Sequence, residues 1–466
     1  MSITIEQFVN LELSRLQRKV QGVNKVKLLL VNNQTKEDSY DIMADQDDVV
    51  ISSNTNRGLL YGVYDYAREF LGYSFSLGNE IMTNKRNCRA INSSPRFSRR
   101  GNIFEVINDV EYILRQIDWG SKYGHNEIFF TFFLFDELAD KIYDDLKKRD
   151  YKVTLGGHSL KWLLSDVIDL QKSEEANISF YHNDQLKEIV IKRVVEICSR
   201  YDIVKRISLW PQDIGIPVDK GHQFMQAYIS FCDEMKQQLL LNNLEVDVEF
   251  IVYNAGLNWG MLDYYEQLHW DNDLDILFAY WGRDYSTDYS STRALDNLKK
   301  WSKLANTTVL EYYSDFFMMT ELYPPLNNRI ESDGSLYHKA GISGILNLVV
   351  PLLNSNYTTK YIERYDYQSY HQENNTCYSL ELWSKTNSEL KTRDGLRDKL
   401  EVLMSPLTIY NTLLFPKRIV DVDIGKENQE VVERLKEIKE LLVMQETPYY
   451  SMIVLIIESI LGEEDD

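Results

Sequence analysis

Eight short apolar runs, each followed by a stretch of helical periodicity, organise the middle of the chain. They cover residues 96–102, 125–132, 151–158, 206–213, 246–254, 274–281, 308–313 and 342–350. Strands that alternate with helices are typical of a parallel sheet, and eight such units close into a barrel. The pattern therefore predicts an α/β protein with a (β/α)8 TIM barrel. Its helices are expected near 109–123, 136–149, 183–202, 221–241, 259–269, 290–304, 330–340 and 357–372.

The segments on either side of the barrel have patterns of their own. Before it, strands are expected at 25–31, 48–53 and 73–77, and helices at 5–20 and 55–72. Gly72 directly follows the second helix, where it suits a helix C-terminus. After residue 373 the pattern is helical. The expected organisation is a small α/β domain (1–95), the barrel (96–372) and a helical C-terminal region (373–466).

Composition narrows the class of protein and of partner. Hydrophobic residues make up 44% of the 466 positions and aromatics 12%, which suits a large core and argues against disorder. The formal net charge of −20 opposes binding to nucleic acid or to an anionic membrane. The run Tyr450–Ile457 is too short to span a bilayer and is interpreted as a buried or oligomer-forming helix. A homodimer through the C-terminal helices is one such arrangement.

The ends of the predicted strands are the places to look for chemistry, because barrel active sites lie there. Two carboxylates, Asp213 and Glu311, are the candidate catalytic residues. The candidate substrate-binding residues are polar or aromatic: Arg100, Asn102, His158, Trp210, Gln212, Tyr253, Tyr280, Trp281, Arg283, Tyr312, Asp315 and Asn347. This set holds no glycine-rich phosphate loop and no spacing of metal ligands, so we expect neither a cofactor nor a metal.

Carboxylates flanked by aromatic residues are what glycoside hydrolysis needs. One carboxyl protonates the leaving oxygen, and the other stabilises or attacks the oxocarbenium-like centre or activates water. Tyr and Trp, of which the chain has 31 and 8, stack on sugar rings while their polar tips bind hydroxyl groups. The expected partner is therefore a carbohydrate substrate.

The two carboxylates have different expected roles. Glu311 lies among apolar and aromatic residues, where desolvation would raise its pKa and suit a general acid. Asp213 would stay ionised more easily. A structural alternative applies to each: Asp213 could cap a helix or form a loop turn, and Glu311 could form an ion pair with Arg100 or Arg283.

The binding candidates also have structural alternatives. His158 could be a structural histidine after a Gly-Gly turn, and Tyr280 and Trp281 could serve packing alone. Arg283 could bind a substrate carboxylate in a bidentate manner or pair with Asp284.

One stretch before the barrel carries a family resemblance. Residues 51–66, with Arg57-Gly58-Leu59-Leu60-Tyr61-Gly62 at their centre, and the following Phe70-Leu71-Gly72-Tyr73 resemble the small domain that precedes the barrel in α-glucuronidases and β-N-acetylhexosaminidases. The barrel segments 97–101, 155–158, 208–213, 310–313 and 341–345 look like those of a bacterial relative of these enzymes. The resemblance covers residues 45–350 and implies a carbohydrate-active barrel.

The end of strand four departs from the hexosaminidase pattern. Those enzymes have an adjacent Asp-Glu pair there, whereas this chain has Gln212-Asp213, so their mechanism does not transfer intact. Two hypotheses follow: a cytoplasmic glycoside hydrolase that uses Asp213 and Glu311, or a non-catalytic carbohydrate-binding or scaffold protein with a degenerate site. The cytoplasmic location is inferred from the lack of a signal-peptide pattern and from four cysteines expected to be free thiols.

Overall fold

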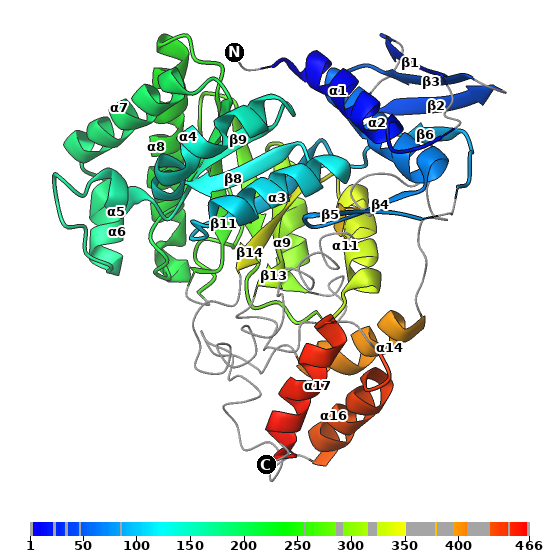
Figure 1. The fold of residues 1–466 in the computed structure, drawn as a ribbon. Helices are drawn as coiled ribbons and strands as arrows, with labels where there is room; N and C mark the ends of the chain where they lie inside the picture. The colour runs from blue at the N-terminus through cyan, green and yellow to red at the C-terminus, as the bar shows by residue number, and fades with distance from the viewer. Residues whose placement is uncertain are drawn as a thin grey trace.

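A closed barrel of eight parallel strands forms the centre of the protein, as the sequence predicts (Figure 1). The computed structural model describes residues 3–21, 25–32, 36–45, 48–83, 86–255, 258–285, 292–315, 324–350, 378–379, 395–407, 429–445 and 448–463. The strands follow one another round the barrel in chain order: β7 (Arg99–Phe104), β8 (Glu127–Thr131), β9 (Lys152–Gly157), β10 (Val204–Leu209), β11 (Asp247–Tyr253), β12 (Leu274–Ala279), β13 (Thr307–Asp315) and β14 (Gly344–Val350).

Helices cover the outside of the barrel. They are α3 (Val110–Lys122), α4 (Phe132–Lys147), α5 (Leu160–Leu163), α6 (Glu174–Tyr181), α7 (Asp184–Arg200), α8 (Val218–Leu241), α9 (Arg293–Trp301) and α11 (Asn327–Lys339). Buried faces such as that of α4, with Phe135, Leu138 and Ile142, pack against the strands. Hydrophobic periodicity thus places most of the predicted helices, because their apolar faces are what the barrel wall buries.

The helix expected at 259–269 is absent, and this prediction is wrong. The segment between β11 and β12 forms turns instead. Gly260 packs so closely on the preceding loop that an added Cβ would lie 1.7 Å from the carbonyl oxygen of Ile216. Further along, the backbone N–H of His269 donates to the side chain of Gln226 on α8 (3.0 Å). Contacts with α8 therefore replace helical hydrogen bonds. The helix expected at 357–372 lies outside the described residues.

The small domain before the barrel has its own sheet and core. The sheet order is β1 (Lys25–Leu30), β3 (Asp48–Ser53), β2 (Tyr40–Asp45) and β6 (Ile91–Ser93), beside a hairpin of β4 (Tyr73–Ser76) and β5 (Asn79–Met82). The predicted helices appear as α1 (Ile5–Gln17) and α2 (Asn56–Tyr66), which continues through the π-helical turn η1 (Ala67–Leu71). Gly72 ends this helix in the left-handed conformation (φ 78°), as predicted.

The last described helices gather on one side of the barrel (Figure 1). They are α14 (Gly395–Met404), the 3-10 turn η5 (Ser405–Leu407), α16 (Gln429–Leu442) and α17 (Pro448–Leu461). The carboxylate of Glu401 on α14 accepts the backbone N–H groups of Asn328 (2.9 Å) and Arg329 (2.8 Å) at the start of α11. Ile453 and Ile457 of α17 are buried within the chain. The homodimer stays a prediction.

The cysteines and the helices of the described residues were also the subject of predictions. Cys198 and Cys232 are buried free thiols, as expected, whereas Cys88 is a free thiol exposed to solvent; Cys377 lies outside the described residues. Within the described part of the chain, no helix is long and apolar enough to cross a membrane.

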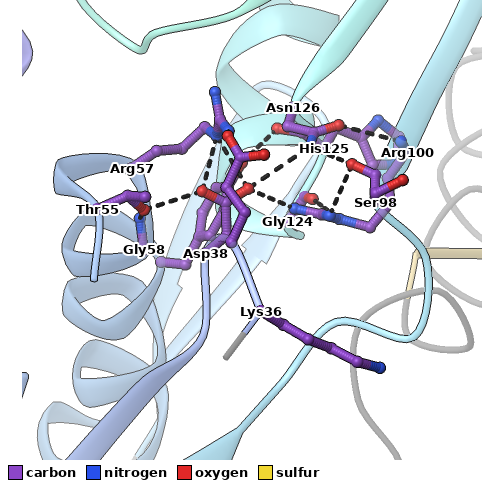
Figure 2. A network of polar contacts seen from close by, with 12 residues as sticks. Lys36, Asp38, Thr55, Arg57, Gly58, Ser98, Arg100, Gly124, His125 and Asn126 are labelled. Carbon is purple, nitrogen blue, oxygen red and sulfur yellow. Dashed lines mark hydrogen bonds and ion pairs between the residues drawn. The ribbon is translucent and has the colours of Figure 1, made fainter. Parts of the chain in front are cut away.

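A buried carboxylate joins the small domain to the barrel (Figure 2). Asp38, which is 0% exposed, accepts hydrogen bonds from Arg57 of α2 (3.0 Å) and from Arg100 of β7 (2.9 Å). Asn126 of the barrel lies 3.4 Å from the same carboxylate, and Thr55 donates to it at 2.9 Å. The Arg-Gly motif that carries the family resemblance therefore supplies a junction between the two folding units.

The position of Arg100 corrects one of the predicted binding residues. The first barrel strand begins at Arg99 and runs to Phe104, whereas the sequence was interpreted as ending it at Asn102. Arg100 therefore lies at the opposite end of the barrel from the mouth, where it also donates to the carbonyl oxygens of Gly124 and Phe97 (both 2.7 Å). The expectation that Arg100 lies at the mouth is wrong.

Candidate active site

The C-terminal mouth of the barrel brings together aromatic residues from four strands. Trp210 follows β10, Tyr253 ends β11, Trp281 follows β12 and Tyr312 lies near the end of β13. Trp210, Tyr253 and Tyr312 are each less than a tenth exposed, and burial raises the pKa values of both tyrosines well above their usual range. They give the mouth a largely apolar, aromatic floor with phenolic hydroxyl groups.

A glutamate that the sequence interpretation missed lies at this mouth. Glu105 comes directly after β7, and Oε1 of its half-buried side chain would lie 3.5 Å from a Cβ added to Gly157 at the end of β9. Burial raises the pKa of Glu105; His158 opposes this shift and the negative charge of Asp213 adds to it. Glu105 is therefore a carboxyl biased toward its protonated form and electrostatically coupled to Asp213.

Asp213 reaches the mouth as predicted, on the loop that follows β10. Its side chain is exposed, and α8 begins only at Val218, so Asp213 does not cap that helix. Asp213 and Glu105 both contribute to the raised pKa of Tyr253, which places all three groups in one electrostatic neighbourhood. Asp213 and Glu105 thus both follow the C-terminal ends of barrel strands, β10 and β7.

His158, which directly follows β9, contacts the loop that carries Asp213. Its Nδ1 lies 2.7 Å from the carbonyl oxygen of Pro211, so this nitrogen carries the proton as a donor and Nε2 is an acceptor in the neutral ring. The ring packs edge-on against Trp210, with centroids 5.3 Å apart. One edge of His158 therefore has a structural role, while its position next to Glu105 keeps it a candidate for substrate contact.

Glu311 has a different environment from the one predicted. Arg99 bonds to Glu249 on the non-neighbouring strand β11 and to Thr308 on β13, so Thr308 faces the barrel interior. Side chains alternate along a strand, so Glu311, three positions later, faces outward. There it contacts α11, where the hydroxyl of Tyr337 donates to it.

Both carboxylate oxygens of Glu311 have protein partners. Arg283 donates to Oε1 at 2.7 Å and Tyr285 to Oε2 at 2.7 Å, and Asp333 binds the other arm of Arg283 at 2.6 Å. Burial raises the pKa of Glu311, although Arg283 opposes the shift. Glu311 is desolvated, as we expected. Its carboxylate, however, forms an ion pair with Arg283, which was the structural alternative, and it faces away from the mouth.

Two further predicted residues, Asn102 and Asn347, belong to the barrel wall. The strand register places Asn347 beside Glu311 and Asn102 beside Asn347, so these three side chains share the outer face. Both asparagines are at most 3% exposed, and Asn102 lies 3.4 Å from Gln116 of α3. Arg283 is also buried, in the Glu311 cluster. The side chains of Asn102, Asn347 and Arg283 therefore lie outside the barrel interior, not at the mouth where they were expected.

The remaining predicted residues lie at the ends of strands or on the loops that follow them. Trp281 is half-buried and its Nε1 donates to Asp315 at 3.1 Å. The ring of half-buried Tyr280 packs against Trp259, 5.4 Å between centroids. The backbone of Gln212 is held by neighbours, whereas its side-chain Oε1 is buried without a hydrogen-bond partner among the described residues. Trp281, Asp315 and Gln212 therefore remain candidates for contact with a substrate.

The mouth combines a carboxyl of raised pKa, an exposed carboxylate, a histidine and aromatic surfaces. This set can donate a proton to a leaving oxygen and stabilise positive charge on a sugar ring. Within the described residues, no group of three His, Cys, Asp or Glu side chains is placed to hold a metal ion. Glu105 could have been found from the sequence, because the apolar pair Ile103-Phe104 continues the strand by two residues and puts a carboxylate at its end.

Comparison with solved structures reveals a shared fold. The chain is similar to a GH138 enzyme targeting pectin rhamnogalacturonan II, with a TM-score of 0.64 at 10% identity, over 98% of this chain and 67% of that one. It is also similar to β-N-acetylhexosaminidase from Bacteroides fragilis (TM-score 0.54, 13% identity, 80% and 82% of the two chains). A GH20 exo-β-N-acetylglucosaminidase from Vibrio harveyi gives a TM-score of 0.53 at 11% identity, over 87% and 72%.

These similarities establish the architecture: a TIM barrel preceded by a small sheet domain, as in glycoside hydrolases of families 138 and 20. No protein-family model and no curated protein matches the chain.

Proposed function

We propose that this chain is a glycoside hydrolase in which Glu105 and Asp213 are the two reacting carboxyls. The observation that carries the proposal is their shared place at the barrel mouth in unlike surroundings. Glu105 is half-buried with a raised pKa, whereas Asp213 is exposed. Two carboxyls whose environments differ in this way are suited to separate acid and base or nucleophile roles.

Glu105 is the proposed general acid. Burial and the nearby charge of Asp213 both favour its protonated form, which can give a proton to the glycosidic oxygen as that bond breaks. Glu105 becomes a carboxylate as the leaving oxygen takes this proton.

Asp213 is the proposed second carboxylate. From the opposite side of the sugar ring it would attack the anomeric carbon or activate a water molecule. The aromatic floor of Trp210, Tyr253 and Tyr312 would support the ring between the two carboxyls. The substrate is a carbohydrate, and the fold neighbours that act on pectin and on N-acetylglucosaminides support this class.

The test is to compare Glu105→Gln, Asp213→Asn and Glu311→Gln on a panel of aryl glycosides. We expect the first two substitutions to lower kcat by about 100-fold or more, since each removes one half of acid–base catalysis, worth roughly 100–10,000-fold. Glu311→Gln should keep turnover per folded molecule within a few-fold of the unsubstituted protein, because its carboxylate does not face the mouth.

Two outcomes would contradict the proposal. Full activity of both Glu105→Gln and Asp213→Asn would exclude these residues as the acid pair. Sugar binding by calorimetry without any cleavage by the unsubstituted protein would instead indicate a non-catalytic carbohydrate-binding protein. For an active enzyme, a sugar-bound structure gives the stereochemistry: carboxyls about 5–5.5 Å apart imply retention, and about 6.5–9.5 Å apart imply inversion.

A further inference from the structure

The loop that carries Asp213 is held by an asparagine on a separate helix. Asn177 lies in α6, and its Oδ1 accepts the backbone N–H of Gln212 at 3.0 Å. Its Nδ2 donates to the carbonyl oxygen of the same residue at 3.1 Å. One side-chain amide thus satisfies both backbone groups of the residue that precedes Asp213, as a neighbouring strand would.

The helix that carries Asn177 packs closely against α8. Asn177 is buried, and the helix that carries it ends in Phe180 and Tyr181, whose rings pack edge-on against Phe231 of α8 at 5.4 and 5.8 Å. A side chain fixed by packing loses little further freedom when it forms hydrogen bonds. The packing of α6 against α8 therefore fixes Asn177, and Asn177 fixes the loop that carries Asp213.

Asp213 itself has no comparable anchor. Its carboxylate is exposed, and no described side chain is hydrogen-bonded to it. The two residues before it hold the loop: His158 bonds to the carbonyl oxygen of Pro211 (2.7 Å), and Tyr253 donates to that of Gln212 (3.3 Å) in addition to the Asn177 contacts. The direction of Asp213 is set through this backbone.

The same device recurs on another mouth loop. Asn254, at the end of β11, accepts the N–H of Trp281 at 2.9 Å and donates to its carbonyl oxygen at 2.7 Å. Trp281 is the aromatic residue of that loop, and Asp315 holds its indole N–H. Two asparagines thus brace two mouth loops, one beside a carboxylate and the other at an aromatic ring.

We infer that Asn177 is a positioning residue for Asp213, which it holds in line with Glu105 across the barrel mouth. This inference rests on the proposed function. A displacement of about 1 Å at a reacting group can lower the rate by on the order of 100-fold, so the loss of this support should act mainly on kcat. Asn254 supports the aromatic residue Trp281, so its substitution should change mainly KM.

Three substitutions test the inference. Asn177→Ala removes both hydrogen bonds, and Asn177→Asp removes the donor while keeping an acceptor. Asn183→Ala is the matched control, because exposed Asn183 caps the next helix through the N–H of Leu186 and does not contact the loop. We expect kcat to fall about 100-fold in Asn177→Ala, with KM within a few-fold, and to stay unchanged in Asn183→Ala.

The pH dependence of Asn177→Asp separates positioning from general destabilisation. When protonated, the introduced carboxyl can again donate to the carbonyl oxygen of Gln212, and burial favours this neutral form. The ratio of its kcat to that of the unsubstituted protein should therefore rise as the pH falls, whereas the ratio for Asn177→Ala stays flat. Equal, flat ratios for both variants would overturn the positioning role.

A measurement that needs no turnover keeps the inference separate from the proposed function. Hydrogen exchange of the peptide over residues 209–216 should become faster in Asn177→Ala than in Asn183→Ala. Unchanged exchange overturns the inference even if sugars are cleaved. Faster exchange without any cleavage by the unsubstituted protein would support the brace and reject the hydrolase. An unchanged kcat in Asn177→Ala, with an active parent protein, would reject the link to catalysis.

Discussion

Glu311 lies within barrel strand β13 and Glu105 directly follows β7, and the two glutamates have different surroundings. The side chain of Glu311 is closed in by Arg283, Tyr285 and Tyr337, so its charge is neutralised within the protein. Glu105 is half-buried beside His158 and coupled to Asp213. At the scale of single residues, a raised pKa alone does not identify an acid catalyst, because both groups have one; access to the mouth distinguishes them.

The raised pKa of Glu105 predicts a pH dependence. A general acid must be protonated, so kcat should fall as the pH rises through the raised pKa of Glu105. Initial rates of aryl glycoside cleavage across the pH range measure this limb. A basic limb that lies in the range of an ordinary exposed glutamate, at about pH 4.3, would contradict the assignment.

The coupling between the two carboxyls can be measured without catalysis. The charge of Asp213 raises the pKa of Glu105, so Asp213→Asn should lower that pKa. The carboxyl carbon resonance of Glu105, followed by NMR during a pH titration, reports the change. His182→Asn, an exposed substitution in the loop between α6 and α7, serves as the control and should leave the resonance unaffected.

At the scale of elements, a difference of two residues in the end of the first barrel strand changes which side chains reach the mouth. The first strand ends at Phe104 rather than Asn102, which moves Arg100 to the far end of the barrel and brings Glu105 to the near one. On β13, strand alternation turns Glu311 outward and Tyr312 inward. A strand can thus be located correctly from its apolar run while its ends and faces are misassigned.

The outward position of Glu311 makes a prediction about stability. Glu311→Gln removes one of two carboxylates from the buried Arg283, while Asp333 keeps its contact. Loss of a partner from a buried pair costs roughly 3–5 kcal/mol, and the lower end is expected here because Asp333 remains. Urea unfolding measures the difference, with the exposed Glu188→Gln as control. Equal unfolding free energies in the two variants would contradict the role of this cluster.

At the scale of the whole molecule, the small domain and the barrel share a buried ionic junction. Asp38 lies between Arg57 of the domain and Arg100 of the barrel (Figure 2). Burial alone would raise the pKa of Asp38, but the two guanidinium groups outweigh it and lower the pKa to about 2. The junction lies at the end of the barrel away from the mouth, where residues serve stability rather than chemistry.

This lowered pKa sets the pH range in which the junction stabilises the protein. Asp38 contributes its full stabilisation above the pKa of an unfolded aspartate, about 3.9, and loses it as the pH falls toward 2. Asp38→Asn should lower the free energy of unfolding by roughly 3–5 kcal/mol at neutral pH, because two buried arginines lose their shared carboxylate. Chemical denaturation from pH 7 to pH 2.5 measures both effects; a variant as stable as the parent at pH 7 would contradict them.

The architecture follows from local patterns in the amino-acid sequence. Eight apolar runs with helical spacers specify a barrel, because strands and helices bury apolar faces with their own periods. The Arg57-Gly58 motif marked the preceding domain, Gly72 marked a helix end, and Asp213 was correctly placed after strand four. Each of these features depends on local pattern alone.

The polar groups that share a site become evident only in the folded chain. Strand ends depend on pairing with neighbours: the apolar run indicates that the first strand can continue to Phe104, but only the barrel register shows that it does so and that Glu105 follows it. Partner choice is also a long-range property: Glu311 meets Arg283 and α11, and Asn177 meets Gln212, only after the chain closes into the barrel. Periodicity records which face of an element is buried, whereas the pairing of charges and amides across elements depends on the closed fold.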